Sequence, residues 1–335
     1  MKRSRMLPAA ILLMAPAAAL LLVVFSALYG AKSIGAADVW AAVTRFDPGN
    51  VDHQIIRHSR LPRGLGALLV GAFLAVSGAL MQGITRNPLA SPSLLGVADG
   101  SVLAVTMAMV FLPDLSGTGL VFVSMAGSAL GAAIVFGIAS LVPGGSSPVK
   151  LAILGALAGM FLGGVADALA MYFRIPQKIS FWYNARLHQM DPELVQLALP
   201  FAVVGLALAL LLARPVSALA LGEETGASLG QNVRRVKLLS MLAVVLLTGT
   251  AVAIAGKIAF IGLIIPHIAR FIGGSDYRWI IPLSAVLGAL FLTFCDLLSR
   301  FMNAPFETPI GIVTALFGVP FFLYLIRRKG ASSHA

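Results

Sequence analysis

Long apolar runs separated by short polar segments constrain this chain more than any other feature. A run of about 17–25 apolar residues is the length that crosses the hydrocarbon core as a helix. Bounded by charged, Pro or Gly residues, such runs predict ten membrane spans. The spans cover about 7–29, 62–84, 93–112, 119–142, 150–173, 193–213, 236–255, 258–273, 279–302 and 309–326. With 11% charged residues, most of the 335-residue chain cannot face water. We therefore predict an all-α polytopic membrane protein with a single transmembrane domain, residues 1–335.

The basic residues at both ends predict the orientation. Three lie before the first span and three after the last, namely Lys2, Arg3, Arg5, Arg327, Arg328 and Lys329. The positive-inside rule places both termini in the cytoplasm, which requires an even number of spans. The apolar run from Leu7 to Tyr29 is longer than the apolar core of a usual signal peptide, which has about 7–15 residues. We therefore expect a retained membrane span. The short eighth span is the weakest, and its loss would leave nine.

Several classes of function lack their sequence signatures. The net charge of +11 lies in short segments between apolar runs, which fits orientation and anionic lipid better than nucleic acid. The lone Cys295 excludes an internal disulfide and a cysteine-cluster metal site, and it is expected to be a small buried apolar residue. No Gly-x-x-x-x-Gly-Lys-Ser/Thr loop is present, so any ATP must be hydrolysed elsewhere. We predict no metal site and no cofactor.

Three polar segments between spans carry information. Pro88 and Pro92 interrupt the helix after Arg86, either as an ordinary turn or as a break that lines a cavity. Residues 214–235 form the longest cytoplasmic polar stretch, in which a short amphipathic helix with two acids, Glu223 and Glu224, near its start would either dock a soluble partner or merely connect two spans. The lone His267, beside a proline, is either structural or a proton relay.

Charged and small residues inside predicted spans suggest specific contacts. Asp296 and Arg300 stand four residues apart and are expected to form a helical ion pair. For Asp167 three alternatives are open: it faces a transport path, pairs with Lys257 or makes a helix-packing hydrogen bond. Asp99 is a second carboxylate within a predicted span. Small residues at 155, 159 and 163 line one face of the fifth span and predict close helix packing.

Together these segments resemble the FecCD family of permeases, which import vitamin B12, heme and ferric siderophores into bacteria. The pieces that carry the resemblance run in the family's order: Arg60-Leu-Pro-Arg63, Ser77-Gly78 with Gln82, Arg86-Asn-Pro-Leu-Ala90, Leu95-Gly96, Leu229-Gly230, Phe260-Ile-Gly-Leu263, Pro266-His267-Ile-Ala-Arg270, Asp296 with Arg300, and Pro309-Ile-Gly-Ile-Val-Thr314. Lys257 departs from the pattern, since relatives usually carry proline there.

The resemblance implies the ten-helix, B12-permease-like fold of a type II ABC importer. It implies a permease subunit without catalytic activity that works in the inner membrane as a homodimer or heterodimer. Its partners would be two cytoplasmic ATPase subunits and a periplasmic or lipid-anchored substrate-binding protein. The implied cargo is an iron chelate, with a ferric siderophore favoured over heme or cobalamin.

The resemblance also assigns roles to residues. Those matching the cytoplasmic gate are Asn87, Leu89, Ser147 and Pro148. Those matching the surface that couples to the ATPase are Glu223, Thr225, Ala227, Leu229 and Gly230. Those matching the outer-face arginines that pair with acidic residues of the binding protein are Arg60, Arg63 and Arg300, because a guanidinium holds a carboxylate bidentately.

Two other functions stay open at this point. An ion-coupled secondary transporter would use Asp99, Asp167 and His267 as its coupling groups, and would work without an ATPase. A membrane-embedded enzyme would need a catalytic motif, and no His-Glu-x-x-His or Gly-x-Ser-x-Gly segment occurs in the sequence.

Overall fold

The computed structural model describes residues 3–30, 32–92, 96–142, 147–183, 186–190, 192–303 and 306–332, and every regular element in this part of the chain is a helix. The longer helices are α1 (Arg3–Leu28), α4 (Leu61–Thr85), α6 (Gly117–Leu141), α7 (Pro148–Tyr172), α9 (Pro192–Leu211), α12 (Val233–Ala255), α14 (Tyr277–Phe301) and α15 (Ile310–Ser332). The shorter helices are α2 (Ala36–Thr44), α3 (Val51–Ile55), α5 (Val97–Phe111), α8 (Pro176–Tyr183), α10 (Ala213–Leu221), α11 (Glu223–Ser228) and α13 (Ile261–Gly273). A π-helical turn (Ile56–Arg60) joins α3 to α4, and a 3-10 turn (Arg186–Gln189) follows α8.

The all-helical membrane fold predicted from the sequence is confirmed. Seven of the described helices are long and apolar enough to cross a membrane, whereas α5, α13 and the apolar part of α15 are shorter. Each of the ten predicted ranges lies mainly on one helix. Because three of those helices are short, the count of ten spans stays a prediction.

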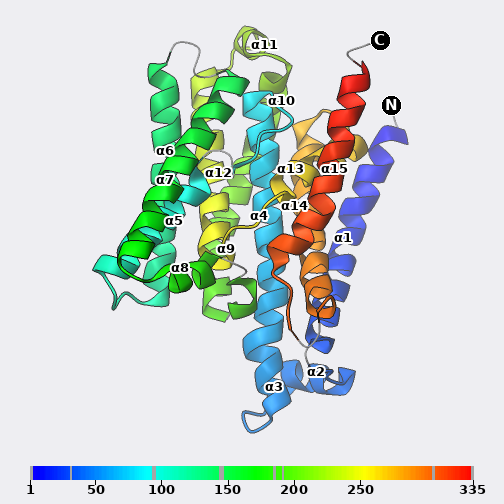
Figure 1. The fold of residues 1–335 in the computed structure, drawn as a ribbon. Coiled ribbons are helices and arrows are strands. Elements are labelled where there is room, and N and C mark those ends of the chain that lie inside the picture. The colour runs from blue at the N-terminus through cyan, green and yellow to red at the C-terminus, as the bar shows by residue number, and fades with distance from the viewer. Residues whose placement is uncertain are drawn as a thin grey trace.

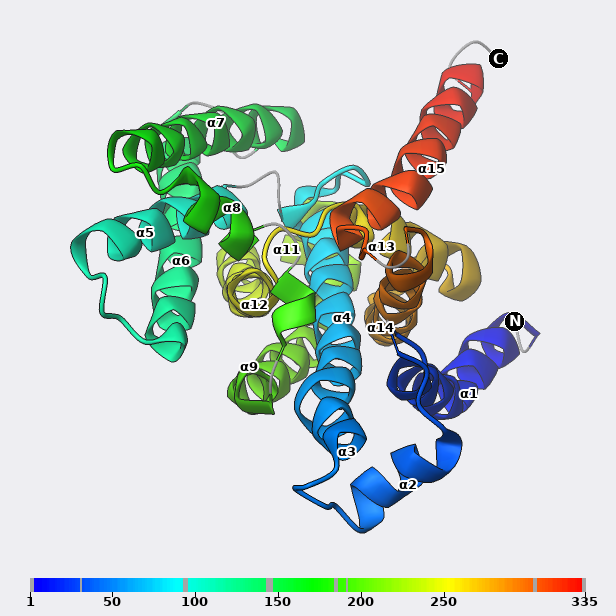
Figure 2. The same cartoon turned by 60° about the horizontal axis from the view of Figure 1, so that its bottom comes forward.

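Helix α4 is the centre of the bundle. Nearly every residue of α4 is buried, and it packs against α12, α13 and α14. Helices α5, α6, α7 and α8 gather on one side of it, and α1, α14 and α15 on the other (Figures 1 and 2). Two glycines permit this packing: a Cβ on Gly71 would lie 2.2 Å from the carbonyl oxygen of Gly288, and one on Gly78 would lie 1.9 Å from that of Gly262. Backbone therefore meets backbone along α4.

The two described ends of the chain lie at the same end of the bundle. Figure 1 places the start of α1 and the end of α15 at the end that also carries α11, while α2 and α3 lie at the opposite end. This arrangement agrees with an even number of crossings. Helices α2, α3 and α8 were not predicted from the apolar runs, because they are only five to nine residues long and lie between those runs.

Candidate functional site

The predicted gate residues Asn87 and Leu89 lie in a tight turn at the end of α4. Arg86 ends the helix in the left-handed conformation (φ 50°). The Asn87 side-chain oxygen accepts a hydrogen bond from the Leu89 backbone N–H (2.9 Å), and the Asn87 carbonyl accepts one from Ala90 (3.0 Å). Such an Asx-type turn satisfies backbone groups where Pro88 prevents a continuous helix. The break predicted here is therefore an ordered turn.

The other predicted gate residues start a different element. Ser147 is the residue before α7, and its carbonyl accepts from the Leu151 backbone N–H (2.9 Å). Pro148 is the first residue of the helix, where a missing N–H costs nothing. These two residues belong to the start of α7 and the other two to the end of α4, and their joint action as a gate remains a prediction.

The predicted coupling surface is the exposed short helix α11 and the turn after it. Glu223 begins α11, and Thr225, Ala227, Leu229 and Gly230 are all exposed. Leu229 is an apolar side chain that is 65% exposed at the end of this polar segment. Gly230 has a φ of 77°, which favours glycine. The expected short helix with an acidic first turn is present.

Glu223 ties this surface to two transmembrane helices. Its carboxylate accepts from the Lys237 ammonium of α12 (2.8 Å) and from the Arg86 guanidinium at the end of α4 (3.4 Å). One carboxylate thus connects the coupling segment with the turn that holds Asn87. The sequence motifs did not reveal this connection, because the three charges are far apart in the chain.

A second anchor joins α10 to α14. The Ser217 hydroxyl donates to the Asp276 carboxylate (3.2 Å) and accepts from the Tyr277 backbone N–H (2.8 Å). Hydrogen bonds from Arg278 lower the pKa of Asp276 below its ordinary value, with a smaller contribution from Ser217. The segment that carries α11 is therefore held at Ser217 in α10 and at Glu223, the first residue of α11.

Two of the predicted docking arginines belong to a buried charge network near the end of the bundle that carries α2 and α3. Asp296, which is 1% exposed, accepts from Arg63 Nε (2.9 Å) and from Arg300 Nη2 (2.5 Å). The predicted helical pair of Asp296 and Arg300 is thus present. Arg63 Nη1 also donates to both carboxylate oxygens of Glu307, at 2.9 and 2.8 Å. Of these four residues, only Glu307 is substantially exposed, at 40%.

The third arginine caps the end of α1. Arg60 Nη1 donates to the carbonyl oxygens of Ala27 (2.7 Å) and Leu28 (2.9 Å), and Arg300 Nη1 donates to that of Ser26 (2.9 Å). Carbonyls in the last turn of a helix lack intrahelical partners, and a cation there also complements the helix dipole. These arginines therefore hold α1, α4 and α14 together, and their part in docking stays a prediction. The sequence pattern did not reveal their internal partners.

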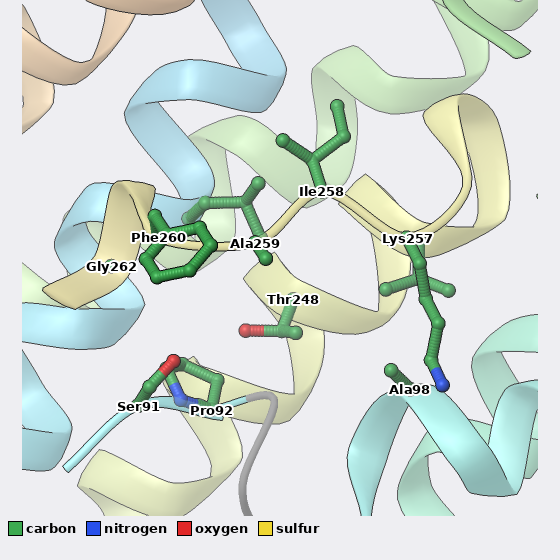
Figure 3. A pocket seen from close by; sticks show the side chains of 11 residues that line it. Ser91, Pro92, Ala98, Thr248, Lys257, Ile258, Ala259, Phe260 and Gly262 are labelled. Atoms are coloured by element: carbon green, nitrogen blue, oxygen red, sulfur yellow. The ribbon is translucent and has the colours of Figure 1, made fainter. Parts of the chain in front are cut away.

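A cavity of about 260 Å³ lies beside the connection between α12 and α13. Ser91, Thr248, Lys257 and Phe260 are among its lining residues. Figure 3 shows the Lys257 side chain extending from this connection toward the first turn of α5, where Ala98 lies. There the Lys257 ammonium forms an ion pair with the Asp99 carboxylate. Lys257 thus pairs with Asp99, and the alternative in which it pairs with Asp167 is wrong.

The remaining polar candidates lie apart. Asp167 is exposed on α7 and forms no hydrogen bond or ion pair with another described residue. His267 is buried on α13, with Nδ1 3.2 Å from the Leu263 carbonyl oxygen one turn earlier. Cys295 is buried, as expected. The described residues contain no group of three or more His, Cys, Asp or Glu side chains that could hold a metal ion.

Comparison with known proteins places this geometry in a family. Residues 18–328 match the model of the FecCD transport family. The chain belongs to that family. This FecCD protein is 55% identical to the iron-uptake system permease protein FeuB of Bacillus subtilis (strain 168), over 97% of both chains. It is 54% identical to the iron(3+)-hydroxamate import system permease protein FhuB of the same organism, over 89% of this chain and 79% of FhuB.

A solved structure agrees with the fold. The FecCD protein superimposes on a metal-chelate type ABC transporter in an inward-facing conformation with a TM-score of 0.82 and 29% sequence identity. The match covers 96% of this chain and 99% of that one. The family expected from the sequence motifs is confirmed.

Proposed function

We propose that this chain is the membrane-spanning permease subunit of a binding-protein-dependent ABC importer that carries a ferric siderophore into the cell. The observation that carries the proposal is the 55% identity to FeuB over nearly the whole of both chains. The similarity to FhuB, a hydroxamate import permease, favours a siderophore over heme or cobalamin. Family membership also favours this function over an ion-coupled transporter.

The partners follow from the chemistry that the chain lacks. Its sequence has no phosphate-binding loop, so the ATP that drives the proposed importer would be hydrolysed by a separate ATPase, which we place at the α11 end of the bundle. Two ATPase subunits, a second permease subunit and a substrate-binding protein would complete the importer. The basic residues at both termini support an inner-membrane orientation with both termini and α11 in the cytoplasm.

The proposed roles of the site residues use the observed geometry. The turn at Asn87 and Leu89, with Ser147 and Pro148, forms the cytoplasmic gate. The exposed surface of α11 contacts the ATPase, and Glu223 links that surface to Arg86 beside the gate. Arg60, Arg63 and Arg300 form the outer end at which the binding protein docks.

Uptake of a radiolabelled ferric siderophore into proteoliposomes tests the proposal. Vesicles that contain the permease, its ATPase and its binding protein should accumulate iron only when ATP is present on the ATPase side. Vesicles that contain this chain alone, with a proton or sodium gradient, are the comparison. Uptake by the chain alone would contradict the importer and support the ion-coupled alternative.

Leu229→Ala should weaken binding of the ATPase. An interface would remove the apolar surface of Leu229 from water, and alanine gives up part of that gain, so we expect a loss of about fivefold to tenfold in affinity. Titration of the purified permease with its ATPase measures the effect, with unchanged unfolding as a check. The matched control is Leu112→Ala, which is also exposed (56%) but follows α5. Equal effects of the two substitutions would argue against α11 as the contact.

Glu307→Gln should strengthen docking of the binding protein by roughly twofold to fivefold. The neutral side chain removes the negative charge beside Arg63 Nη1, while Asp296 still holds the rest of the guanidinium. Titration at two salt concentrations measures the effect, which should shrink as salt screens the charges. Reversing the charges of Arg60 and Arg63 is also expected to weaken docking, but it would break internal contacts as well.

The control for that experiment is Asp114→Asn. Asp114 is exposed in the connection between α5 and α6. This substitution therefore removes one negative charge at a site that is not part of the arginine network. If Asp114→Asn and Glu307→Gln change the affinity equally, the effect belongs to net charge, and Arg63 has no special part in docking.

A further inference from the structure

The ion pair between Asp99 and Lys257 is a pair of charges placed among membrane-spanning helices. Asp99 lies in the first turn of α5, and Lys257 lies in the connection between α12 and α13. Charged side chains at membrane depth are costly and are usually retained for a function. Among the described residues, Asp99 is the only hydrogen-bond partner of the Lys257 ammonium.

The two partners of this pair differ in accessibility. The Asp99 side chain is 17% exposed and lies against the glycine face of α7. A Cβ on Gly159 would lie 2.6 Å from Asp99 Oδ2, and one on Gly163 would lie 3.8 Å from Oδ1. The predicted glycine stripe thus makes room for this carboxylate. The Lys257 side chain, by contrast, is 45% exposed.

The backbone at Lys257 is fixed in place. Gly256 has a φ of 76°, and a Cβ there would lie 2.4 Å from the Tyr183 carbonyl oxygen, so only glycine fits. That carbonyl also accepts a hydrogen bond from the Lys257 backbone N–H (3.2 Å). Because the main chain is held and Asp99 is enclosed, the ammonium is kept at one position on the cavity wall.

Lys257 lines two neighbouring cavities, and the second of these shares residues with a third. It lines the 260 Å³ cavity in Figure 3 and also a cavity of about 470 Å³ that reaches Asp167 and Ser180. The second cavity shares Met171 and Pro176 with another of about 470 Å³, which Arg174 and Lys178 line. Among the described residues that line these three cavities are three cations, Arg174, Lys178 and Lys257. Apart from Asp99, the partner of Lys257, the one carboxylate among the described residues that these cavities reach is Asp167.

We propose that Lys257 is a binding site for an anionic group of the transported iron chelate, such as a carboxylate or catecholate oxygen. This inference rests on the proposed importer function. An ammonium has three donors, and the bond to Asp99 leaves two for a ligand in the cavity. Asp99 holds the ammonium in place when no anion is bound. The donors of an ammonium rotate about its bond to the side chain, so they can turn toward chelate oxygens that vary in position.

A purely structural clamp between α5 and the α12–α13 connection makes a different prediction. If the pair only holds helices together, loss of either partner should impair transport of every substrate to a similar extent. If Lys257 binds the chelate, loss of Lys257 should impair only anionic chelates, and loss of the Asp99 charge should not.

The test is iron-55 uptake into vesicles that contain the permease with its ATPase and binding protein. The two probes are ferric citrate, which is anionic, and a neutral ferric tris-hydroxamate. Lys257→Met should lower uptake of ferric citrate at subsaturating concentration about tenfold and leave tris-hydroxamate uptake within about twofold. Lys257→Arg should retain most citrate uptake. Asp99→Asn should leave citrate uptake equal to wild type or higher, because the ammonium is then free for the ligand.

Three outcomes would overturn the inference. The first is an equal loss of both chelates in Lys257→Met and Asp99→Asn. The second is rescue of citrate uptake by the charge-swapped double variant Asp99→Lys, Lys257→Asp, which restores a clamp but moves the cation. The third is that the wild-type protein takes up only the neutral chelate. That result would contradict an anion-binding role of Lys257 but not the proposed importer function. Absence of ATP-driven uptake of any chelate would instead refute the proposed function on which the inference rests. Uptake of the neutral chelate also shows that each variant is folded.

Discussion

Replacing Asp296 with asparagine is expected to lower the free energy of unfolding by about 3–5 kcal/mol. Asp296 is 1% exposed and accepts from both Arg63 and Arg300, which are themselves buried. An amide of the same shape keeps the packing but leaves two guanidinium groups in a dry site with half of their counter-charge removed. Buried charges without a partner are among the most destabilising features of folded proteins. Unfolding of the purified permease in detergent with increasing denaturant measures the loss.

The matched control is Asp52→Asn. Asp52 also pairs with a cation, Lys32, at 2.5 Å, but that ammonium side chain is 61% exposed. Exposed ion pairs contribute about 1 kcal/mol or less, so this substitution should change the unfolding free energy little. If Asp296→Asn and Asp52→Asn have similar effects, the buried charge network around Asp296 contributes no more to stability than an exposed ion pair does.

Replacing Gly78 with alanine is expected to cost about 3 kcal/mol or more, at the upper end of overpacking effects. The added Cβ would lie 1.9 Å from the Gly262 carbonyl oxygen and 2.4 Å from its Cα. Both atoms are backbone, so no side chain can rotate away, and α13 must move relative to α4. The same displacement would disturb Gln82, whose amide donates to the carbonyls of Gly262 and Leu263.

Gly137→Ala is the control for this prediction. Gly137 is exposed on α6, and nothing lies within 4 Å of an added Cβ. Because alanine favours a helix over glycine by about 0.5–1 kcal/mol, this variant should be as stable as wild type or slightly more stable. Unfolding midpoints of both variants, measured side by side in detergent, give the comparison. A Gly78→Ala protein as stable as the Gly137→Ala protein would show that the two helices can separate without cost.

The sequence predicted the long helices well, because apolar length is a local property. The boundaries of α4, α12 and α14 differ from the predicted ranges by at most three residues. The sequence also predicted the helical pair of Asp296 and Arg300, because that pair depends only on a spacing of four residues. The small helices α2 and α8 were missed, since they are too short for the span criterion.

The contacts across the chain could not be predicted from the sequence. The partner of Lys257 is 158 residues away, and the fold, through the close approach of α5 to the α12–α13 connection, selects Asp99 over Asp167. Glu307, which pairs with Arg63, lies 244 residues further along the chain. Exposed arginines and buried ones have the same sequence signature, so a pattern alone cannot separate a docking surface from an internal brace.

The position of the two chain ends has a practical consequence. Because the described start of α1 and end of α15 lie at the same end of the bundle (Figure 1), a second copy can be fused in tandem through a linker that never enters the membrane. Such a fusion allows one half to carry a substitution while the other stays intact. A tandem of two wild-type halves that imports iron would show that identical subunits suffice, whereas an inactive tandem rescued by a different permease chain would show that the importer needs two kinds.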